Sequence, residues 1–294
     1  MKRSIYANLF VAVVVFFVAA VLVPGQSTMD FTNFTVNTVL VVAVFTFGMM
    51  LAYSVSNRQT RLDKIREQLR EQDAILLNVY DLSRVFGDGA LAQVRERIDQ
   101  FLQTQIDYQL QDFERSHDAL RLLSAHLMQL KTKTRGQEDA KSKILDNMGE
   151  LTRIHKRVCY NVQNTMMSYE WISLIVLGGI IIFSLFHENQ NTWISIAIVT
   201  VVSGALVLFL LILKELDSLQ WHERSWIWNP LSSLFLDLDL LPYFPDDVFT
   251  TKRLSLNEVH VFSGVKRIRI AHYPNPYPDN TGKRVDIVDL KNPV

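Results

Sequence analysis

Residues 36–70 read VNTVLVVAVFTFGMMLAYSVSNRQTRLDKIREQLR, and the change of character within this stretch decides the fold. Residues 36–55 contain no Asp, Glu, Lys or Arg, and a helix needs roughly 20 apolar residues to cross a bilayer. From Arg58 onward, charged residues alternate with apolar ones, and neither Pro nor Gly intervenes after Gly48. The stretch therefore predicts a membrane span that continues without a break into an amphipathic helix outside the membrane.

Three further apolar runs, Ile5–Val23, Trp171–Phe186 and Trp193–Leu213, also lack charged residues. Together the four runs predict an all-α membrane protein with four transmembrane helices in two pairs. A cytoplasmic helical bundle is inserted between spans 2 and 3, and a small tail with some β structure follows span 4. The expected domains are transmembrane helices 1 and 2 (1–56), the bundle (57–168), transmembrane helices 3 and 4 (169–213) and the C-terminal tail (214–294).

The distribution of basic residues predicts the orientation in the membrane. The loops 24–33 and 187–192 contain no Lys or Arg, whereas the other flanks of the spans are basic. The positive-inside rule then places both termini and the bundle in the cytoplasm, as in a multi-pass protein of the plasma (inner) membrane. The first run could instead be a signal peptide, but Pro24 gives a poor cleavage context, so we interpret the run as an anchor.

In the insert, Leu62, Ile65, Leu76 and Tyr80 are spaced in threes and fours, as on the apolar side of a helix. We expect one helix over 33–86, then an antiparallel bundle whose last helix runs straight into the third span. His117 and His155 are the insert's candidates for chemistry. Neither has a second ligand at suitable spacing on a shared face, so we interpret both as polar surface or seam residues.

The tail is expected to hold a short amphipathic helix over 231–241, a break at 242–247, and short strands over 254–261, 265–270 and 285–290. Four aspartates in and around the break raise the possibility of a calcium site, since Ca²⁺ takes six to eight oxygen ligands. The spacing lacks the glycine and closing glutamate of an EF-hand loop, and a solvated acidic face is the simpler interpretation. These aspartates are Asp237, Asp239, Asp246 and Asp247.

Composition and motifs narrow the function classes. The chain has 30 basic and 30 acidic residues, and this neutral balance argues against nucleic acid as a partner. The one cysteine, Cys159, excludes a disulfide within the chain. No P-loop, GxSxG, HExxH, CxxC or glycine-rich dinucleotide turn is present, so we predict that the protein is not an enzyme and needs no cofactor or metal. An enzyme acting on lipid would need inward-facing carboxylates or histidines near the membrane interface. The histidines and carboxylates near the ends of the spans are more simply interpreted as loop residues.

One row of residues in the second span suggests a function. Phe45, Met49 and Tyr53 are spaced at i, i+4 and i+8, and Ser56 follows at the inner edge of the span. If this helix faced a symmetry axis, the row would form stacked apolar rings, and such constrictions gate a pore by dewetting. The alternative is that the row packs against a neighbouring span.

At this point the chain resembles the bestrophin-like membrane proteins, including bacterial bestrophin homologues. The likeness covers the layout of residues 1–245 and a local pattern at the end of the second span. Where bestrophins have Gly-Phe-Arg and a further Arg seven residues later, this chain has Ala52-Tyr53-Ser54 and then Thr60-Arg61-Leu62-Asp63. The Pro-Phe that follows the family's last span resembles Pro242-Tyr243-Phe244.

The resemblance implies a homopentamer in the lipid bilayer whose second spans line an anion-favouring pore for small inorganic ions. The family's apolar neck falls on Phe45, Met49 and Tyr53, with Ser56 at the inner edge of the pore. We therefore predict an oligomeric passive ion channel. The alternative is a non-conducting scaffold or sensor that is anchored in the membrane and acts through its cytoplasmic helical bundle.

Overall fold

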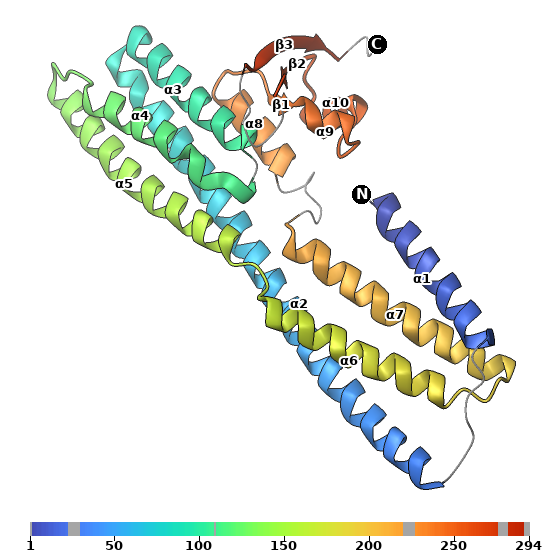
Figure 1. Ribbon diagram of the computed structural model, residues 1–294. Helices are drawn as coiled ribbons and strands as arrows, with labels where there is room; N and C mark the ends of the chain where they lie inside the picture. The colour runs from blue at the N-terminus through green and yellow to red at the C-terminus, as the bar shows by residue number, and fades with distance from the viewer. Residues whose placement is uncertain (1, 23–29, 109, 220–226, 276–281, 291–294) are drawn as a thin grey trace. The chain divides into compact units, whose positions relative to one another are not determined.

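The computed structural model describes residues 2–22, 30–108, 110–219, 227–275 and 282–290. The chain divides into two compact units, which are described separately. Unit 1 comprises residues 1–62 and 165–221, and unit 2 comprises residues 63–164 and 222–294. Most of the structure is helical, and Figure 1 labels its elements.

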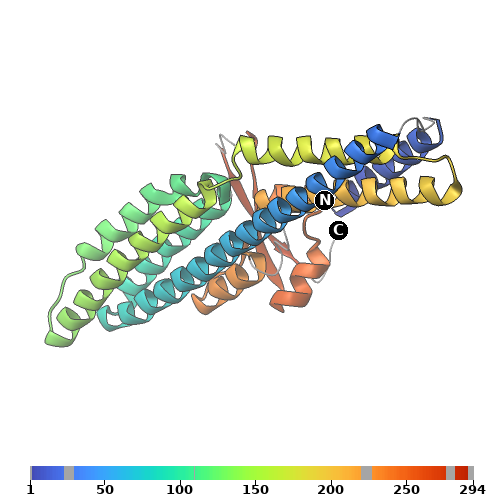
Figure 2. The same ribbon diagram turned by 90° about the horizontal axis from the view of Figure 1, so that it is seen from below.

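The predicted uninterrupted helix is confirmed. α2 runs from Asp30 to Ser83, and a 3₁₀ turn, η1 (Arg84–Phe86), follows it. Its course can be followed in Figure 1 and, from below, in Figure 2. Gly87 ends the turn with φ of 91°, a backbone conformation that residues with a Cβ rarely adopt.

Unit 1 contains α1 (Lys2–Leu22), the first part of α2, α6 (Ser168–His187) and α7 (Trp193–Asp217). α1 packs on α7 at close range, because a Cβ added to Gly204 would lie 2.9 Å from Cγ2 of Val13. The loop between α6 and α7 contributes Asn189, whose buried side chain donates a hydrogen bond of 2.8 Å to the backbone oxygen of Ala20. A small residue and one buried amide therefore hold α1 against its neighbours.

Among the described residues, three stretches contain a helix long and apolar enough to cross a membrane. They are Phe34–Phe86, Arg135–His187, which includes α6 and is interrupted at residues 164–167, and Trp193–Asp217. The stretch Phe10–Leu22 of α1 is a shorter apolar helix. The structure thus supports a protein with long apolar helices, and the complete arrangement of four spans remains a prediction. The expected outer loop over 24–33 lies largely outside the described residues.

The expectation that the last bundle helix runs straight into the third span is wrong. Four residues separate α5 (Arg135–Gln163) from α6, and these residues, Asn164–Met167, are not helical. Local polar groups replace the lost helical hydrogen bonds. The backbone N–H of Met166 donates to the Asp217 carboxylate at 2.9 Å, and that of Met167 donates to Glu170 at 3.2 Å. The capping of two helix ends therefore outweighs the continuity of the helical pattern.

Unit 2 is built on a helical core. α3 (Asp88–Asp107), η2 (Leu110–Ser116), α4 (His117–Met128) and α5 pack with the second part of α2, which confirms a helical insert. The predicted apolar side of α2 is buried, with Leu62, Ile65, Leu76 and Tyr80 at most 2% exposed. Gln72 interrupts this side and is also buried, and its amide exchanges two hydrogen bonds with that of Gln105 at 2.9 and 3.1 Å.

The tail belongs to the same core. It contains α8 (Asn229–Asp237), β1 (Tyr243–Pro245), α9 (Asp246–Thr250), α10 (Leu256–Ser263), β2 (Arg267–His272) and β3 (Arg284–Asp289). The sheet order is β1-β2-β3, with β1 parallel and β3 antiparallel to β2. Phe244 pairs with Ile270, and Ile268 pairs with Val288.

The tail confirms some predictions and corrects others. The short helix over 231–241 and the strands near 265–270 and 285–290 are confirmed. The strand expected over 254–261 is wrong, because this segment forms α10. Ser255 caps that helix by accepting from the N–H of Glu258, whose side chain accepts in return from the N–H of Ser255. Such a capping box favours a helix where the apolar alternation alone suggests a strand.

Candidate functional site

The four residues predicted to line a pore lie on one side of α2, and that side is exposed in the chain. Phe45 is 65% exposed, Met49 54% and Tyr53 67%, and Ser56 is also exposed. No part of the described chain covers them. Packing against a neighbouring span of the same chain therefore does not account for the row.

The opposite side of α2 is the one that packs. Ala43 and Phe47 are each 4% exposed and belong to a core with Leu174 of α6 and Leu213 of α7. A Cβ added to Gly178 of α6 would lie 3.7 Å from the Phe47 ring, so the glycine leaves room for that ring. This packing fixes the rotation of α2 and leaves the predicted neck residues on the outside.

The exposed side continues along α2 from Val42 to Asp81. Because an α-helix turns about 100° per residue, residues spaced by three or four positions stay within about 45° of one line on its surface. All residues within that band from Val42 to Asp81 are exposed. We call this band the exposed stripe of α2. It comprises Val42, Phe45, Met49, Tyr53, Ser56, Thr60, Asp63, Glu67, Glu71, Ala74, Asn78 and Asp81.

A buried ion cluster lies near the end of α7. Arg58 and Arg61 of α2 are 4% and 5% exposed, and Nη1 of each lies 3.3 and 3.4 Å from Oδ1 of Asp217. Arg61 also donates to the backbone oxygen of Asp217 at 3.0 Å. The same Oδ1 accepts the N–H of Met166. One carboxylate thus links α2, α7 and the segment before α6.

Sequence reasoning missed this cluster. Arg58 and Arg61 were interpreted as flanking charges that orient the span, and Arg61 also as a position of the family pattern. The signal that could have found the cluster is Asp217 itself, an acidic residue just beyond a span whose other end has none. A carboxylate at that position can neutralise arginine side chains of α2 that are buried when the chain folds.

Of the two expected places for His155, the surface and the seam, the structure shows the seam: it lies on the buried side of α5 with Leu151 and Val158. Its side chain is 1% exposed and stacks on Phe113 with ring centroids 4.9 Å apart. The His117 ring lies 5.9 Å away. Cys159, four residues further along α5, places Sγ 3.7 Å from Nε2 of His155, so a second potential ligand does share this face.

Burial sets the protonation of this cluster. Removal from water lowers the pKa of His155 to about 4, and the neighbouring His117 adds to the shift. Burial and the nearby Glu114 carboxylate raise the pKa of the Cys159 thiol to about 11. The imidazole and thiol are therefore neutral at physiological pH. Within the described residues, no group of three or more potential ligands is placed to hold a metal ion.

The tail aspartates form ion pairs and hydrogen bonds with the protein. Asp239 accepts a hydrogen bond of 3.0 Å from the Tyr80 hydroxyl. Asp247 lies 2.6 Å from the Arg253 guanidinium, and Asp246 lies 3.1 Å from Nδ1 of His272. The expected solvated acidic face is found: Asp239 is exposed, and the side chains of Asp246 and Asp247 are 39% and 42% exposed while they pair with His272 and Arg253. No calcium cluster is found among them.

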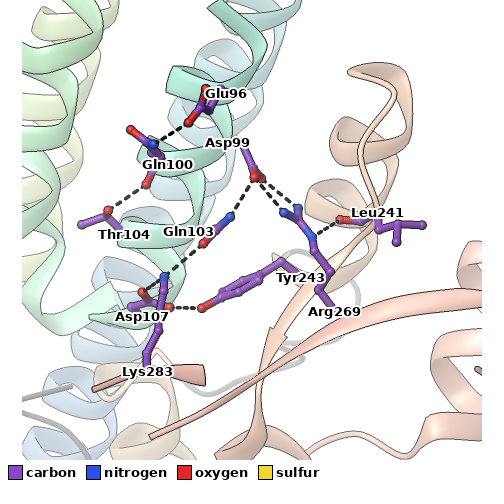
Figure 3. A network of polar contacts seen from close by, with 10 residues as sticks. All are labelled: Glu96, Asp99, Gln100, Gln103, Thr104, Asp107, Leu241, Tyr243, Arg269 and Lys283. Carbon is purple, nitrogen blue, oxygen red and sulfur yellow. Dashed lines mark hydrogen bonds and ion pairs between the residues drawn. The ribbon is translucent and has the colours of Figure 1, made fainter. Parts of the chain in front are cut away.

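A polar network holds the sheet against α3, as Figure 3 shows. The guanidinium of Arg269 on β2 makes two hydrogen bonds to the Asp99 carboxylate at 2.7 and 2.8 Å, and its Nε donates to the backbone oxygen of Leu241 at 2.9 Å. Both side chains of the pair are 14% exposed. A two-pronged pair of this kind fixes orientation as well as distance.

A second carboxylate, Asp107, extends the network at the end of α3. It accepts a hydrogen bond of 2.6 Å from the Tyr243 hydroxyl and another from the Tyr273 hydroxyl. Lys283 reaches its other oxygen at 2.8 Å (Figure 3). Burial and the adjacent Asp107 charge raise the pKa of both tyrosines, so both stay protonated and act as donors. The Pro242-Tyr243-Phe244 pattern thus carries a structural contact that sequence reasoning did not assign.

Comparison with known families gives one finding. The family described as Bestrophin-like domain matches residues 7–218. The match includes α1, α2, the helical insert, α6 and α7, and it ends before α8. No curated protein matches the chain. No solved structure matches it.

Proposed function

Because the chain belongs to the bestrophin-like family, we propose that it forms an oligomeric passive ion channel with a hydrophobic neck at Phe45, Met49 and Tyr53. The match over residues 7–218 and the long apolar helices support a membrane protein of a channel family. The proposed arrangement has four spans and cytoplasmic termini, in the plasma (inner) membrane. The number of copies implied by the resemblance is five.

The exposure of the neck residues is the observation that carries the proposal. The interior of unit 1 is filled by side chains such as Phe47, Leu174 and Leu213, so one chain has little room for an ion path of its own. The predicted neck residues lie on the outside instead. A shared axis between copies would bring them together as stacked apolar rings, which gate by dewetting.

The neck also explains how such a pore could be closed without a moving plug. Apolar rings exclude water and therefore oppose the passage of a hydrated ion until they widen. They carry no charge, so they leave the choice of ion to other groups along the path. The bestrophin resemblance implies a preference for anions, and the neck itself neither favours nor opposes it.

The experiment is a chloride and potassium flux assay in proteoliposomes that compares wild type with Phe45→Ala/Met49→Ala. Flux should rise severalfold in the double variant, because shorter side chains widen and wet the constriction. The matched control is Ile175→Ala/Phe183→Ala on α6, where both side chains are also exposed, at 59% and 69%. The control should leave flux unchanged.

Absence of flux from a folded oligomer in every variant would contradict the channel and favour the membrane-anchored scaffold or sensor. A monomer or dimer in detergent would also contradict it, because neither provides a pore shared by several second spans. Equal gains from the two double variants would show that the effect is general loosening rather than a neck.

A further inference from the structure

The two buried arginines of α2 lie just beyond the predicted neck, on the other side of the helix. Arg58 follows Tyr53 by five positions, which is about 7.5 Å along the helix axis. It follows Met49 by nine positions and therefore lies about 180° from it, while Arg61 lies about 120° from Met49. Arg58 and Arg61 are 4% and 5% exposed. The neck residues thus face outward, and the arginines face the rest of their own chain.

Asp217 holds this inward side of α2. Its Oδ1 lies 3.3 Å from Nη1 of Arg58 and 3.4 Å from Nη1 of Arg61. Arg61 also donates to the backbone oxygen of Asp217 at 3.0 Å. Because Asp217 is the last residue of α7, these contacts join α2, close to the neck, to the end of another apolar helix. Breaking such a buried pair is costly, whereas an exposed pair contributes little.

The same carboxylate also contacts the segment that joins α5 to α6. Oδ1 of Asp217 accepts the backbone N–H of Met166 at 2.9 Å, and Met166 belongs to the non-helical residues 164–167. The chain enters this segment from α5, the last helix of the insert. A displacement of the segment therefore acts on the oxygen that holds both arginines. The buried ion cluster is a point where α2, α7 and the connection from the insert meet.

We propose that Asp217, Arg58 and Arg61 are positioning residues of the pore, which hold α2 against its own chain and so keep the neck from narrowing. The proposal rests on the proposed function, in which the neck residues of several copies face a shared axis. Apolar side chains around a narrow aqueous path gain free energy by leaving water together, so the neck favours closure. The ion contacts pull the same helix in the opposite direction.

The test compares ion flux through the reconstituted full-length protein and its variants. Asp217→Asn should lower flux roughly fivefold, within the range by which single contacts shift an equilibrium between two states. The potassium-to-chloride permeability ratio should stay unchanged, because no neck residue is altered. Asp217→Glu keeps the charge and should recover part of the flux. The matched control is Asp99→Asn, which breaks the partly buried pair with Arg269 between α3 and β2 and should leave flux unchanged.

The decisive comparison introduces Asp217→Asn into the Phe45→Ala/Met49→Ala variant. A cluster that acts through the neck has nothing to hold open once the neck is wide, so the loss of flux should disappear in this background. An equal loss in both backgrounds would reveal general damage to the fold and overturn the positioning role. If Asp217→Asn does not assemble, Arg61→Lys takes its place, because lysine keeps the charge without the planar guanidinium that reaches both oxygens of Asp217.

The outcomes separate this proposal from the channel itself. Flux in Asp217→Asn, or in Arg61→Lys where it takes that variant's place, that equals or exceeds that of wild type overturns the positioning role and leaves the channel standing. A loss of flux that is confined to the background with an intact neck supports the role. Absence of flux from a folded oligomer, including the Phe45→Ala/Met49→Ala variant, overturns the channel and the positioning role with it.

Discussion

Asp217 shows how much can depend on one side chain. Its carboxylate contacts two arginines that are almost fully buried and accepts a backbone N–H from the segment before α6. Removing the partner of a buried charge strongly lowers the free energy of unfolding, whereas an exposed ion pair contributes little to it. The importance of a charged residue near a span is therefore decided by burial, which charge counting along the sequence does not reveal.

Replacement of Asp217 by Asn should destabilise the protein by roughly 3 kcal/mol, because it leaves Arg58 and Arg61 without their shared negative charge. Thermal unfolding in detergent is the measurement, and the midpoint should fall by several degrees. The control is Asp63→Asn, which breaks the exposed pair with Arg66 and should cost at most about 0.5 kcal/mol. Equal losses of stability in the two variants would show that the buried cluster stabilises the protein no more than an exposed ion pair does.

His155 predicts a pH dependence of stability. Its pKa in the folded protein is about 4, below the ordinary value of 6.5, so the unfolded chain binds a proton at higher pH than the folded one. His155 therefore does not reduce the free energy of unfolding above about pH 6.5, and it reduces this free energy progressively as the pH drops toward 4. Between pH 7.5 and pH 5 the loss attributable to His155 should be about 2 kcal/mol.

The measurement is the unfolding midpoint of wild type and of His155→Phe across this pH range. The phenylalanine variant keeps an aromatic ring against Phe113 and should show a shallower decline toward pH 5. His260→Asn changes an exposed histidine and should follow the wild-type curve. Parallel curves for wild type and His155→Phe would contradict the predicted role of His155.

At the scale of elements, close packing explains why α1 needs a glycine opposite it. Gly204→Ala should destabilise the protein by roughly 1–2 kcal/mol, because the new Cβ would meet the Val13 side chain. Val13→Ala introduced together with Gly204→Ala should recover part of the loss. Gly179→Ala, where a Cβ meets nothing within 4 Å, is the control for thermal unfolding and should be neutral or stabilising. Lack of rescue would contradict the contact.

The attachment of the sheet to α3 gives a second prediction at this scale. Arg269→Gln removes the two-pronged pair with Asp99, and the tail should exchange amide hydrogens faster and be cleaved sooner by protease. Asp99→Arg combined with Arg269→Asp should restore part of the protection. Arg284→Gln alters a pair whose arginine is 80% exposed and should change neither. Unaltered protection in Arg269→Gln would mean that apolar contacts alone hold the tail.

The elements also show how far the sequence leads. Apolar periodicity was sufficient to predict α2, the helical insert and two of the strands, because burial follows the spacing of side chains in these elements. It failed at Asn164–Met167 and at α10, where capping groups determine the structure. It did not reveal the partners of His155 and Asp217, because these partners lie on other helices and pair only after folding.

At the scale of the whole molecule, the exposed stripe of α2 predicts contacts between copies. Ser56→Cys should be joined between copies by a short bis-maleimide reagent, because the stripes converge on a shared axis. The wild-type chain is a suitable background, since the thiol of Cys159 has a pKa of about 11 and little reactive thiolate. Leu122→Cys, exposed on α4, is the control that should remain uncoupled.

The measurement is the appearance of linked species on a denaturing gel, and coupling at Leu122 rather than at Ser56 would place the axis elsewhere.

This prediction lies beyond what the sequence could supply. The spacing of Phe45, Met49 and Tyr53 was also compatible with packing against a neighbouring span, and the sequence alone favoured that interpretation. Only the burial of the opposite side, where Ala43 and Phe47 pack, separates the two interpretations.

The contrast between unbroken α2 and the non-helical segment at Asn164–Met167 has a consequence for how related sequences can diverge. One residue inserted within α2 rotates everything beyond it by about 100° and would move Glu67 out of line with Met49. An extra residue at Asn164–Met167 adds only loop. Relatives of this chain should therefore vary in length at the second position and keep a constant spacing along the first.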